Sequence, residues 1–263
     1  MARILPAPAA IWIKKLYYPH LIRNFPEQRW PGAEIVRRLV RAGDCVVDAG
    51  ANIGYVTALL SRWVGPAGFV HAFEPVPETF DLLQHNIRAT RLRNVVAHAC
   101  ALSSDSGHAH MDIPQYSGGG SNLYESRIAG AGERPAGAVR VETKRLDAFS
   151  AEWGRPVSCI KIDVEGHELD VLRGSKSTLE RDHPALYIEV SGDPDDPSSS
   201  ASELVQFLSE YGYAVHIHAD GVLRPRRVGD TSTDYFFLTK QHLELLCGSR
   251  APGPRHFRKG LFR

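Results

Sequence analysis

The sequence predicts an α/β fold, with a mostly parallel sheet covered by helices on both faces, and three observations support this prediction. Short runs rich in apolar and β-branched residues alternate with longer segments whose apolar residues recur at helical spacing. Such alternation implies right-handed crossovers between parallel strands. A glycine-containing turn joins the first strand to its helix, and acidic residues end the first two strands.

The alternation begins with the compact run DCVVDA at residues 44–49 and continues to about residue 240. In the second helical segment, Phe80, Leu83 and Ile87 share one face, as expected for a helix packed on a sheet. The expected strands are 44–49, 69–73, 95–102, 157–162 and 185–190. The expected helices are 55–64, 78–90, 168–179 and 202–210.

The end of the pattern differs from its beginning. Residues 214–218 and 235–239 resemble strands, but the segment between them is rich in turn residues and has no helical pattern. We therefore expect a hairpin, and so an antiparallel strand that closes the sheet. Residues 103–138, which include the run GGGSN at 118–122, and residues 193–200 are expected to be loops that shape the acceptor pocket.

Length and composition define the expected domains. The chain has 263 residues, of which 43% are hydrophobic, enough for one sizeable core. We expect an N-terminal helical cover over residues 1–43 and one α/β domain over 44–240. Residues 241–263 should form a short helix followed by a basic, disordered tail. Charge is nearly balanced, with 31 Lys or Arg against 30 Asp or Glu, which argues against a nucleic-acid partner.

The sequence also predicts where the protein resides. No apolar run approaches the roughly 18 residues of an integral membrane segment, and no small-residue cleavage site follows the apolar stretch at 7–13. The four cysteines stand far apart, so we expect free thiols and a cytoplasmic location. Residues 1–43 hold eight Lys or Arg and several aromatic residues. They suit peripheral membrane association, but we favour a cover or a homodimer contact.

The most informative segment is VVDAGANIGY at residues 46–55, in which a strand ends at Asp48 and glycines follow at Gly50 and Gly54. Glycines allow a sharp turn and a close approach of the backbone to a ligand, and the helix that follows presents unpaired N–H groups. Glu74 ends the next strand, where a carboxylate can accept both ribose hydroxyls of an adenosine.

The same segment lacks the glycines of a dinucleotide fingerprint, which would fall at Asn52 and Tyr55. Asp48 would repel a pyrophosphate and attract an ammonium group. Adenosine plus ammonium without phosphate describes S-adenosylmethionine, which we predict as the cofactor. Two alternatives remain: an NAD-dependent oxidoreductase, disfavoured by the broken fingerprint, and a non-catalytic S-adenosylmethionine-binding protein.

The motifs DAGANIGY, FEP and IKIDVEGHELDVLRG are similar to those of FkbM-type methyltransferases, over about residues 44–240. The resemblance implies a Rossmann-like class I methyltransferase domain, with a mostly parallel seven-stranded sheet that contains one antiparallel strand. It also implies O-methylation of a hydroxyl on a sugar or secondary metabolite, and therefore a small-molecule or glycan acceptor.

The resemblance further assigns residues to the cofactor. The methionine part would be surrounded by Asp48, Gly50, Asn52 and Gly54, with Glu74 at the ribose. The adenine would lie near Pro75, Val76 and residues 101–103, with Asp105 as a candidate for its amine contact. We also count Tyr55, Leu102, Ser103 and Asp163 among the cofactor-binding residues.

The segment KIDVEGHE places Asp163, Glu165 and His167 just after the fourth strand, where open α/β sheets bind ligands. An alcohol should lose its proton as the new bond forms, so a positioned base assists methyl transfer. We predict these three residues as catalytic. The alternatives are that Asp163 only binds the cofactor, that Glu165 only stabilises a helix start, and that His167 is a surface residue at that helix start.

Glu189, at the end of the fifth strand, is expected to bind the substrate and is a fourth candidate for the base. Ser121 and Asn122 are expected to contact the acceptor. The acidic spacing is not a metal-binding fingerprint, so no metal is predicted.

Overall fold

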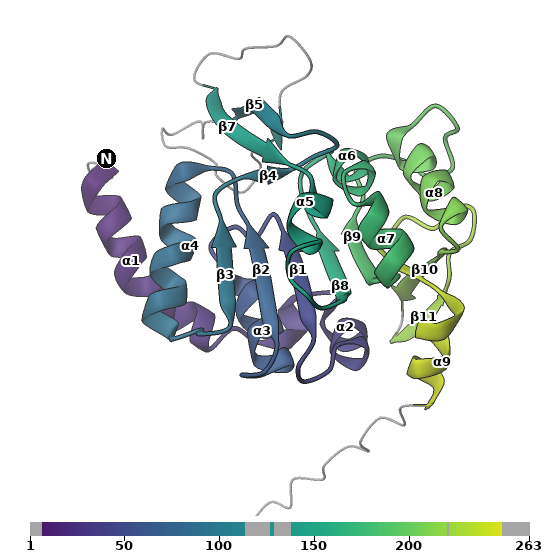
Figure 1. Cartoon of the computed structure of the whole chain (residues 1–263), viewed down its shortest axis with the longest axis horizontal. Helices are drawn as coiled ribbons and strands as arrows, with labels where there is room; N and C mark the ends of the chain where they lie inside the picture. The colour runs from purple at the N-terminus through teal and green to yellow at the C-terminus, as the bar shows by residue number, and fades with distance from the viewer. Residues whose placement is uncertain (1–6, 114–126, 129–137, 220, 249–263) are drawn as a thin grey trace, which may run out of the picture.

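The computed structural model describes residues 7–113, 127–128, 138–219 and 221–248, and its main feature is an eight-stranded sheet of order β11-β10-β12-β9-β8-β1-β2-β3 (Figure 1). Its strands are β1 (Cys45–Ala49), β2 (Phe69–Phe73), β3 (Val95–His98), β8 (Val157–Ile162), β9 (Ala185–Glu189), β10 (Ala214–Ala219), β11 (Val222–Pro225) and β12 (Asp234–Leu238). The helices are α1 (Ala7–Arg23), α2 (Ala33–Leu39), α3 (Tyr55–Val64), α4 (Pro77–Thr90), α5 (Leu146–Ser150), α6 (Glu168–Arg173), α7 (Lys176–Asp182), α8 (Ser200–Glu210) and α9 (Lys240–Gly248), and a short 3-10 helix, Glu27–Arg29, precedes α2.

The predicted α/β architecture and the hairpin near the C-terminus are confirmed. Strands β1, β2, β3, β8 and β9 pair in parallel, and β12 lies between β9 and β10, antiparallel to both. The count of seven strands is one too low. The turn-rich segment before β12 contains β11, which extends the edge as a second antiparallel strand by pairing with β10.

A second, four-stranded sheet was not predicted. It consists of β4 (Ala101–Leu102), β5 (Gly107–Asp112), β6 (Arg127–Ile128) and β7 (Val139–Lys144), and it lies above the carboxyl ends of the main strands in Figure 1. The expected third strand, 95–102, therefore ends early at His98, and the expected loop 103–138 contains β5 and β6. Strands β5 and β7 are largely polar, because one face of the small sheet is exposed. They therefore have no apolar run by which the sequence would predict them.

The helix predicted at 168–179 is two helices, α6 and α7, separated at Gly174. A Cβ atom on Gly174 would lie 2.0 Å from the carbonyl oxygen of Ser103. The chain that leaves β4 thus approaches this point closely, which only a glycine permits. The short helix α5, which packs against α7, was also not predicted.

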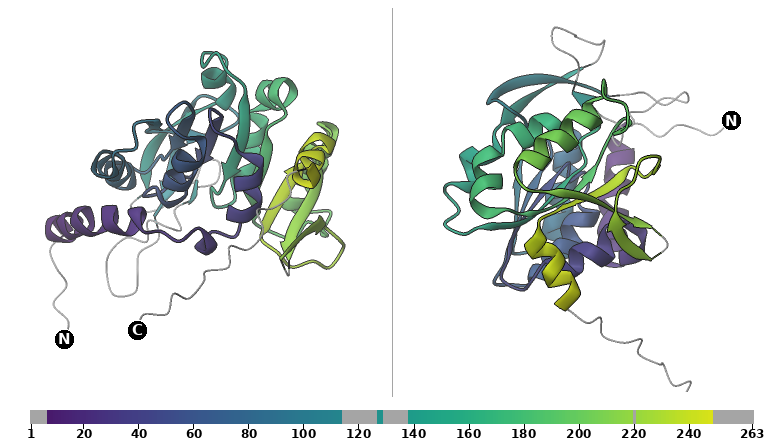
Figure 2. Two further views of the ribbon diagram at one scale, coloured as in Figure 1. Left: turned by 90° about the horizontal axis from the view of Figure 1, so that it is seen from below. Right: turned by 90° about the vertical axis from the view of Figure 1, so that its right-hand side faces the viewer.

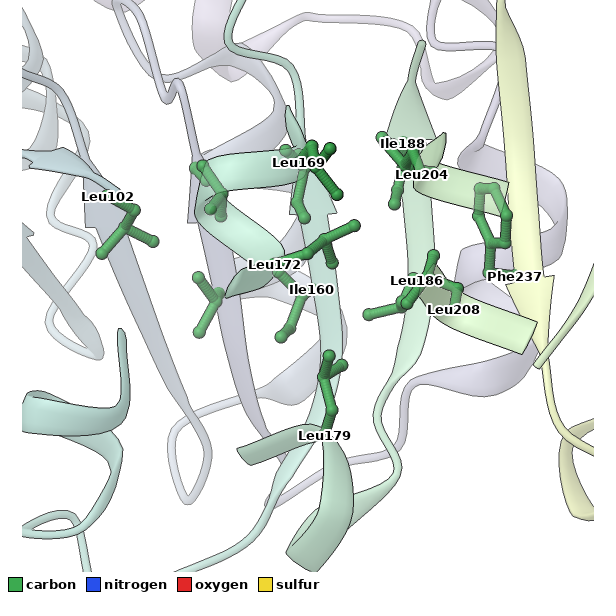
Figure 3. Close-up of a cluster of buried hydrophobic side chains, with 14 of the residues drawn as sticks. Leu102, Ile160, Leu169, Leu172, Leu179, Leu186, Ile188, Leu204, Leu208 and Phe237 are labelled. Atoms are coloured by element: carbon green, nitrogen blue, oxygen red, sulfur yellow. The ribbon is translucent and has the colours of Figure 1, made fainter. Parts of the chain in front are cut away.

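Helices cover both faces of the main sheet, as Figure 2 shows from two sides. Alternate strand residues point to opposite faces, so Val46 packs with α2, α3 and α9 whereas Val47 packs with α5 to α8. Helix α4 lies on the first face, through Leu83 against Ala72. The larger cluster is drawn in Figure 3, where leucines of α6 and α8 lie against Ile160, Leu186 and Ile188. This burial explains the nearly continuous apolar strands.

The N-terminal helices pack against the α/β core. Helix α1 contacts α4 and α3, and α2 contributes Ile35 and Val36 to the buried cluster beneath the sheet. Within the part of the chain that the structure describes, every helix is too short or too polar to cross a bilayer. The four cysteines are free thiols, and three of them are buried.

Candidate active site

A cleft lies at the carboxyl ends of β1, β2, β8 and β9, beneath β5 and β6 of the small sheet. The strand order changes direction between β1 and β8, which is where open α/β sheets bind ligands. One wall of the cleft is apolar, and one end of the cleft is acidic. The described lining residues are Gly50, Asn52, Phe73, Glu74, Pro75, Val76, Cys100, Ala101, Leu102, Met111, Ile128, Asp163, Val164, Glu165, His167 and Glu189.

Glu74 is the buried carboxylate of this cleft, with only 5% of the residue exposed. Its Oε2 accepts a hydrogen bond from the backbone N–H of Asn52 at 3.0 Å, and its Oε1 accepts one from that of Val76 at 2.9 Å. Burial outweighs these two bonds and raises the pKa of Glu74 to about 7. A carboxylate fixed in this way keeps free lone pairs for further donors, as the two hydroxyls of a ribose would provide.

The glycines of the turn after β1 allow the sharp turn that was predicted, and they also have a packing role. Gly50 and Gly54 both have positive φ, at 75° and 99°. A Cβ atom on Gly50 would lie 1.9 Å from the carbonyl oxygen of Asp163, and one on Gly54 would lie 2.9 Å from the side chain of Leu83. The glycines therefore let the loop pack against the end of β8 and against α4, rather than only opening space for a ligand.

Asp48 does not line the cleft, which corrects the expectation that its carboxylate meets the cofactor directly. It is fully buried, and its Oδ2 accepts a 2.6 Å hydrogen bond from the hydroxyl of Thr57 on α3. Its Oδ1 lies 3.3 Å from the Nζ of Lys161. Because Asp48 has an even-numbered position on β1, it points to the same face as Val46, toward α3.

Lys161 is the site residue that sequence analysis missed. Its buried ammonium lies 3.3 Å from the carboxylates of both Asp48 and Asp163 and donates a 2.8 Å hydrogen bond to the carbonyl of Gly50. Burial alone would lower the pKa of Lys161, but the two carboxylates outweigh it and raise the pKa. A lysine within the apolar run VSCIKI was the available signal, because a fully buried lysine needs charged partners.

The structure brings Asp163, Glu165 and His167 together at the acidic end of the cleft, as predicted for their positions. Glu165 and Gly166 have φ of 52° and 89°, so the chain turns sharply there. Glu168 is buried and accepts a 2.7 Å hydrogen bond from the N–H of Gly166, which stabilises the turn before α6.

His167 is held by two neighbours. Its Nε2 lies 3.0 Å from the hydroxyl of Ser103, and its Nδ1 lies 3.4 Å from a carboxylate oxygen of Asp170. Burial lowers the pKa of His167, although Asp170 opposes this effect. Ser103, predicted to contact the cofactor, thus contacts His167 instead and is not among the described lining residues.

Glu189 extends from the end of β9 into the same cleft. Partial burial raises its pKa to about 7, and the neighbouring charges of Asp163, Asp234 and Glu165 contribute to the increase. Glu189 can therefore gain or lose a proton near neutral pH.

The remaining predicted residues divide between the cleft and its surroundings. Pro75 and Leu102 line the cleft, whereas Asp105 is exposed and outside the described lining. Tyr55 begins α3 and places its ring 4.7 Å from that of Phe25, away from the described lining. Ser121 and Asn122 lie outside the described residues.

The donor set of the cleft fits S-adenosylmethionine better than a phosphate-bearing nucleotide. The apolar wall formed by Val76, Leu102 and Met111 suits an adenine, and Glu74 suits its ribose. The acidic end suits a sulfonium and an ammonium, and no described lining residue is Lys or Arg. In the described ranges, no group of three or more His, Cys, Asp or Glu is placed to hold a metal ion, and the absence of a metal stays a prediction.

The main sheet has the order 3-2-1-8-9-12-10, and among these strands only β12 is antiparallel; β11 is an additional strand at the edge. This sheet and its cleft define an S-adenosylmethionine-dependent methyltransferase of class I. A family model described as the methyltransferase FkbM domain matches residues 48–215, and the chain belongs to this family. The oxidoreductase alternative is thereby rejected.

Three curated relatives share this similarity. Methyltransferase sdnD of Sordaria araneosa is 32% identical, covering 65% of this chain and 73% of the relative. Hexuronic acid methyltransferase AglP of Haloferax volcanii is 30% identical (65% and 67%). The 31-O-demethyl-FK506 methyltransferase FkbM of Streptomyces tacrolimicus is also 30% identical (69% and 76%). The solved structure of methyltransferase FkbM from Methylobacillus flagellatus aligns with a TM-score of 0.49 at 16% identity, covering 88% of this chain and 58% of that one.

Proposed function

We propose that this methyltransferase acts on a hydroxyl group of a small-molecule or glycan acceptor. The observation that carries the proposal is the convergence of Asp163, Glu165 and Glu189 at one end of a cleft whose other part suits an adenosine. Carboxylates at this position can orient a hydroxyl and accept its proton. Relatives named for a hexuronic acid and for the 31-O position of FK506 support an oxygen acceptor.

When bound, S-adenosylmethionine would supply a methyl group on a sulfonium. The acceptor oxygen would bond to the methyl carbon as the carbon–sulfur bond breaks, with S-adenosylhomocysteine as the leaving group and the hydroxyl proton passing to a carboxylate of the cleft. We assign Glu74 to the ribose hydroxyls of the cofactor, with Asn52 and Pro75 beside it, and Asp163 to its positive charge. Lys161 pairs with the carboxylate of Asp163 and donates a hydrogen bond to the carbonyl of Gly50, which fixes the position of both. Asp48 contributes indirectly, because it anchors Lys161. Alignment of the reacting groups by such a fixed site supplies much of the rate enhancement.

We assign the role of general base to Glu189, in place of the three residues that the sequence favoured. The carboxylate of Asp163 already has the buried ammonium of Lys161 as its partner, 3.3 Å away. The Nε2 of His167 is already within hydrogen-bonding distance of Ser103. Glu189 lies in the cleft and binds protons near pH 7, which is the range in which a base works best. Glu165 would then help to orient the acceptor.

The acceptor class is tested by incubating the protein with methyl-labelled S-adenosylmethionine and extracts of sugars and secondary metabolites. Mass spectrometry then locates the label. A labelled ether oxygen supports the proposal, and a labelled ester oxygen, nitrogen or carbon contradicts it. Binding of S-adenosylhomocysteine without label transfer to any acceptor would instead favour the non-catalytic alternative.

The base is tested with Glu189→Gln, compared with Asp163→Asn and with the exposed control Glu152→Gln. Loss of the base should lower single-turnover methyl transfer by about 10²- to 10⁴-fold, while affinity for S-adenosylhomocysteine stays close to that of wild type. The rate should rise with pH through about 7 in the wild type, and this rise should be absent in Glu189→Gln. Normal turnover in Glu189→Gln would return the role to Asp163, Glu165 or His167.

A further inference from the structure

Helix α1 presents a row of large apolar side chains to solvent, here named the α1 stripe, which consists of Trp12, Ile13, Leu16 and Tyr17. These residues are between 46% and 64% exposed. Ile13, Leu16 and Tyr17 follow Trp12 by one, four and five positions, which places all four residues on one face of the helix. A helix on a protein surface normally turns such a face toward the core, and a contiguous exposed apolar patch marks an interaction site.

The opposite face of α1 is attached to the protein by polar contacts with α4. The Nζ of Lys15 lies 2.6 Å from the carboxylate of Asp81, and that of Lys14 lies 3.7 Å from Glu78. The backbone carbonyl of Lys15 also accepts a 2.9 Å hydrogen bond from His85. The helix is therefore held against α4 through its partly exposed lysines, and its stripe faces solvent.

We propose that the α1 stripe is the centre of a twofold interface with a second copy of this chain. The pairs Trp12–Leu16 and Ile13–Tyr17 form ridges at i, i+4 spacing, which can pack into the equivalent grooves of an identical helix. A twofold axis near Leu16 would place the same apolar patch on both sides, as an isologous interface requires.

The charges beside the stripe favour this occupant over a lipid surface. Lys14 and Lys15 flank the stripe on its two sides by helical position, and each has an acidic partner on α4. A rotated copy would thus meet both signs of charge at the rim. A helix that binds anionic lipid carries uncompensated basic residues beside its apolar face, whereas here Glu78 and Asp81 neutralise them and remain 41% and 54% exposed.

The proposal is tested by the mass of the full chain in solution, measured by sedimentation from about 1 to 100 μM, a range that brackets micromolar affinity. We expect a dimer. Leu16→Glu should raise the dissociation constant by at least about 100-fold, because two leucines leave the interface and two charges enter it. The control Val228→Glu, at a residue that is 87% exposed and lies outside α1, should leave the mass unchanged.

Folding of Leu16→Glu is checked by circular dichroism and by affinity for S-adenosylhomocysteine. Should it fail to fold, Leu16→Cys in a Cys247→Ser background should form a disulfide-linked dimer under mild oxidation, whereas Val228→Cys should not. A wild-type monomer throughout the concentration range would overturn the proposal. So would dimerisation that persists in Leu16→Glu, or a monomer that floats with phosphatidylglycerol vesicles only while its stripe is intact.

Discussion

Replacing Lys161 by methionine tests the physical account of the site most directly. The side chain becomes shorter by one atom, stays unbranched and loses the charge that lies 3.3 Å from both Asp48 and Asp163. Asp48 is fully buried and then retains only its hydrogen bond from Thr57. The loop carbonyl of Gly50 loses its 2.8 Å donor as well.

The expected loss of stability follows from the burial of both charges. Removing one partner of a buried ion pair costs about 3–5 kcal/mol, because the other charge stays buried without compensation. For a chain of this size each kcal/mol lowers Tm by about 2–4 °C, so a decrease of about 6–20 °C is expected. Adding Asp48→Asn to Lys161→Met removes the orphaned charge and should restore part of this loss.

The assay is guanidinium denaturation of the four members of this double-mutant cycle, with affinity for S-adenosylhomocysteine measured beside it. Lys240→Met is the matched control, because the Lys240 side chain is 91% exposed and its change should be nearly neutral. A loss below about 1 kcal/mol in Lys161→Met, or a further loss on adding Asp48→Asn, would refute the role given to this buried pair.

Three further predictions concern Glu74 and the glycine turn. Glu74→Gln should weaken S-adenosylhomocysteine binding by about 10- to 150-fold in calorimetry, because each charge-assisted hydrogen bond contributes about 1.5–3 kcal/mol. The affinity of the wild type should also decrease as pH is lowered through about 7, where Glu74 gains a proton. An affinity that does not change with pH would contradict this. Stability of the cofactor-free protein should change in the opposite sense, decreasing as pH rises from about 4.5 to about 7, because the folded state retains a proton that the unfolded chain has released; urea denaturation should show a smaller slope in Glu74→Gln. Gly50→Ala should lower Tm far more than Gly212→Ala. Both residues have positive φ, but of the two only Gly50 would place its Cβ atom against a backbone oxygen. Equal decreases in Tm would show that φ alone matters.

Much of the site could be predicted from strand ends. Glu74, Asp163 and Glu189 each follow or end an apolar run, and the carboxyl ends of parallel strands meet at one edge of a sheet. Local pattern was therefore enough to place these three carboxylates in one cleft. It was also enough to disfavour a pyrophosphate, because the glycines required at Asn52 and Tyr55 are absent.

The direction of a side chain at a strand end could not be predicted in the same way. Asp48 stands directly beside Lys161 in the pairing of β1 with β8, and both point toward α3 rather than into the cleft. Their register joins segments more than a hundred residues apart, and a shift of one residue would turn each side chain to the other face. Nothing within either strand specifies that register.

The sequence by itself determined the class of fold, the cofactor and the family to which the chain belongs, since these depend on local periodicity and on short motifs. Only the tertiary structure decided that Lys161 joins Asp48 to Asp163, that Met111 and Ile128 of the small sheet close over the cleft, and that α1 turns its apolar stripe outward. The physical reason is that these features depend on strand register and on docking between distant segments, where long-range packing overrides local preference.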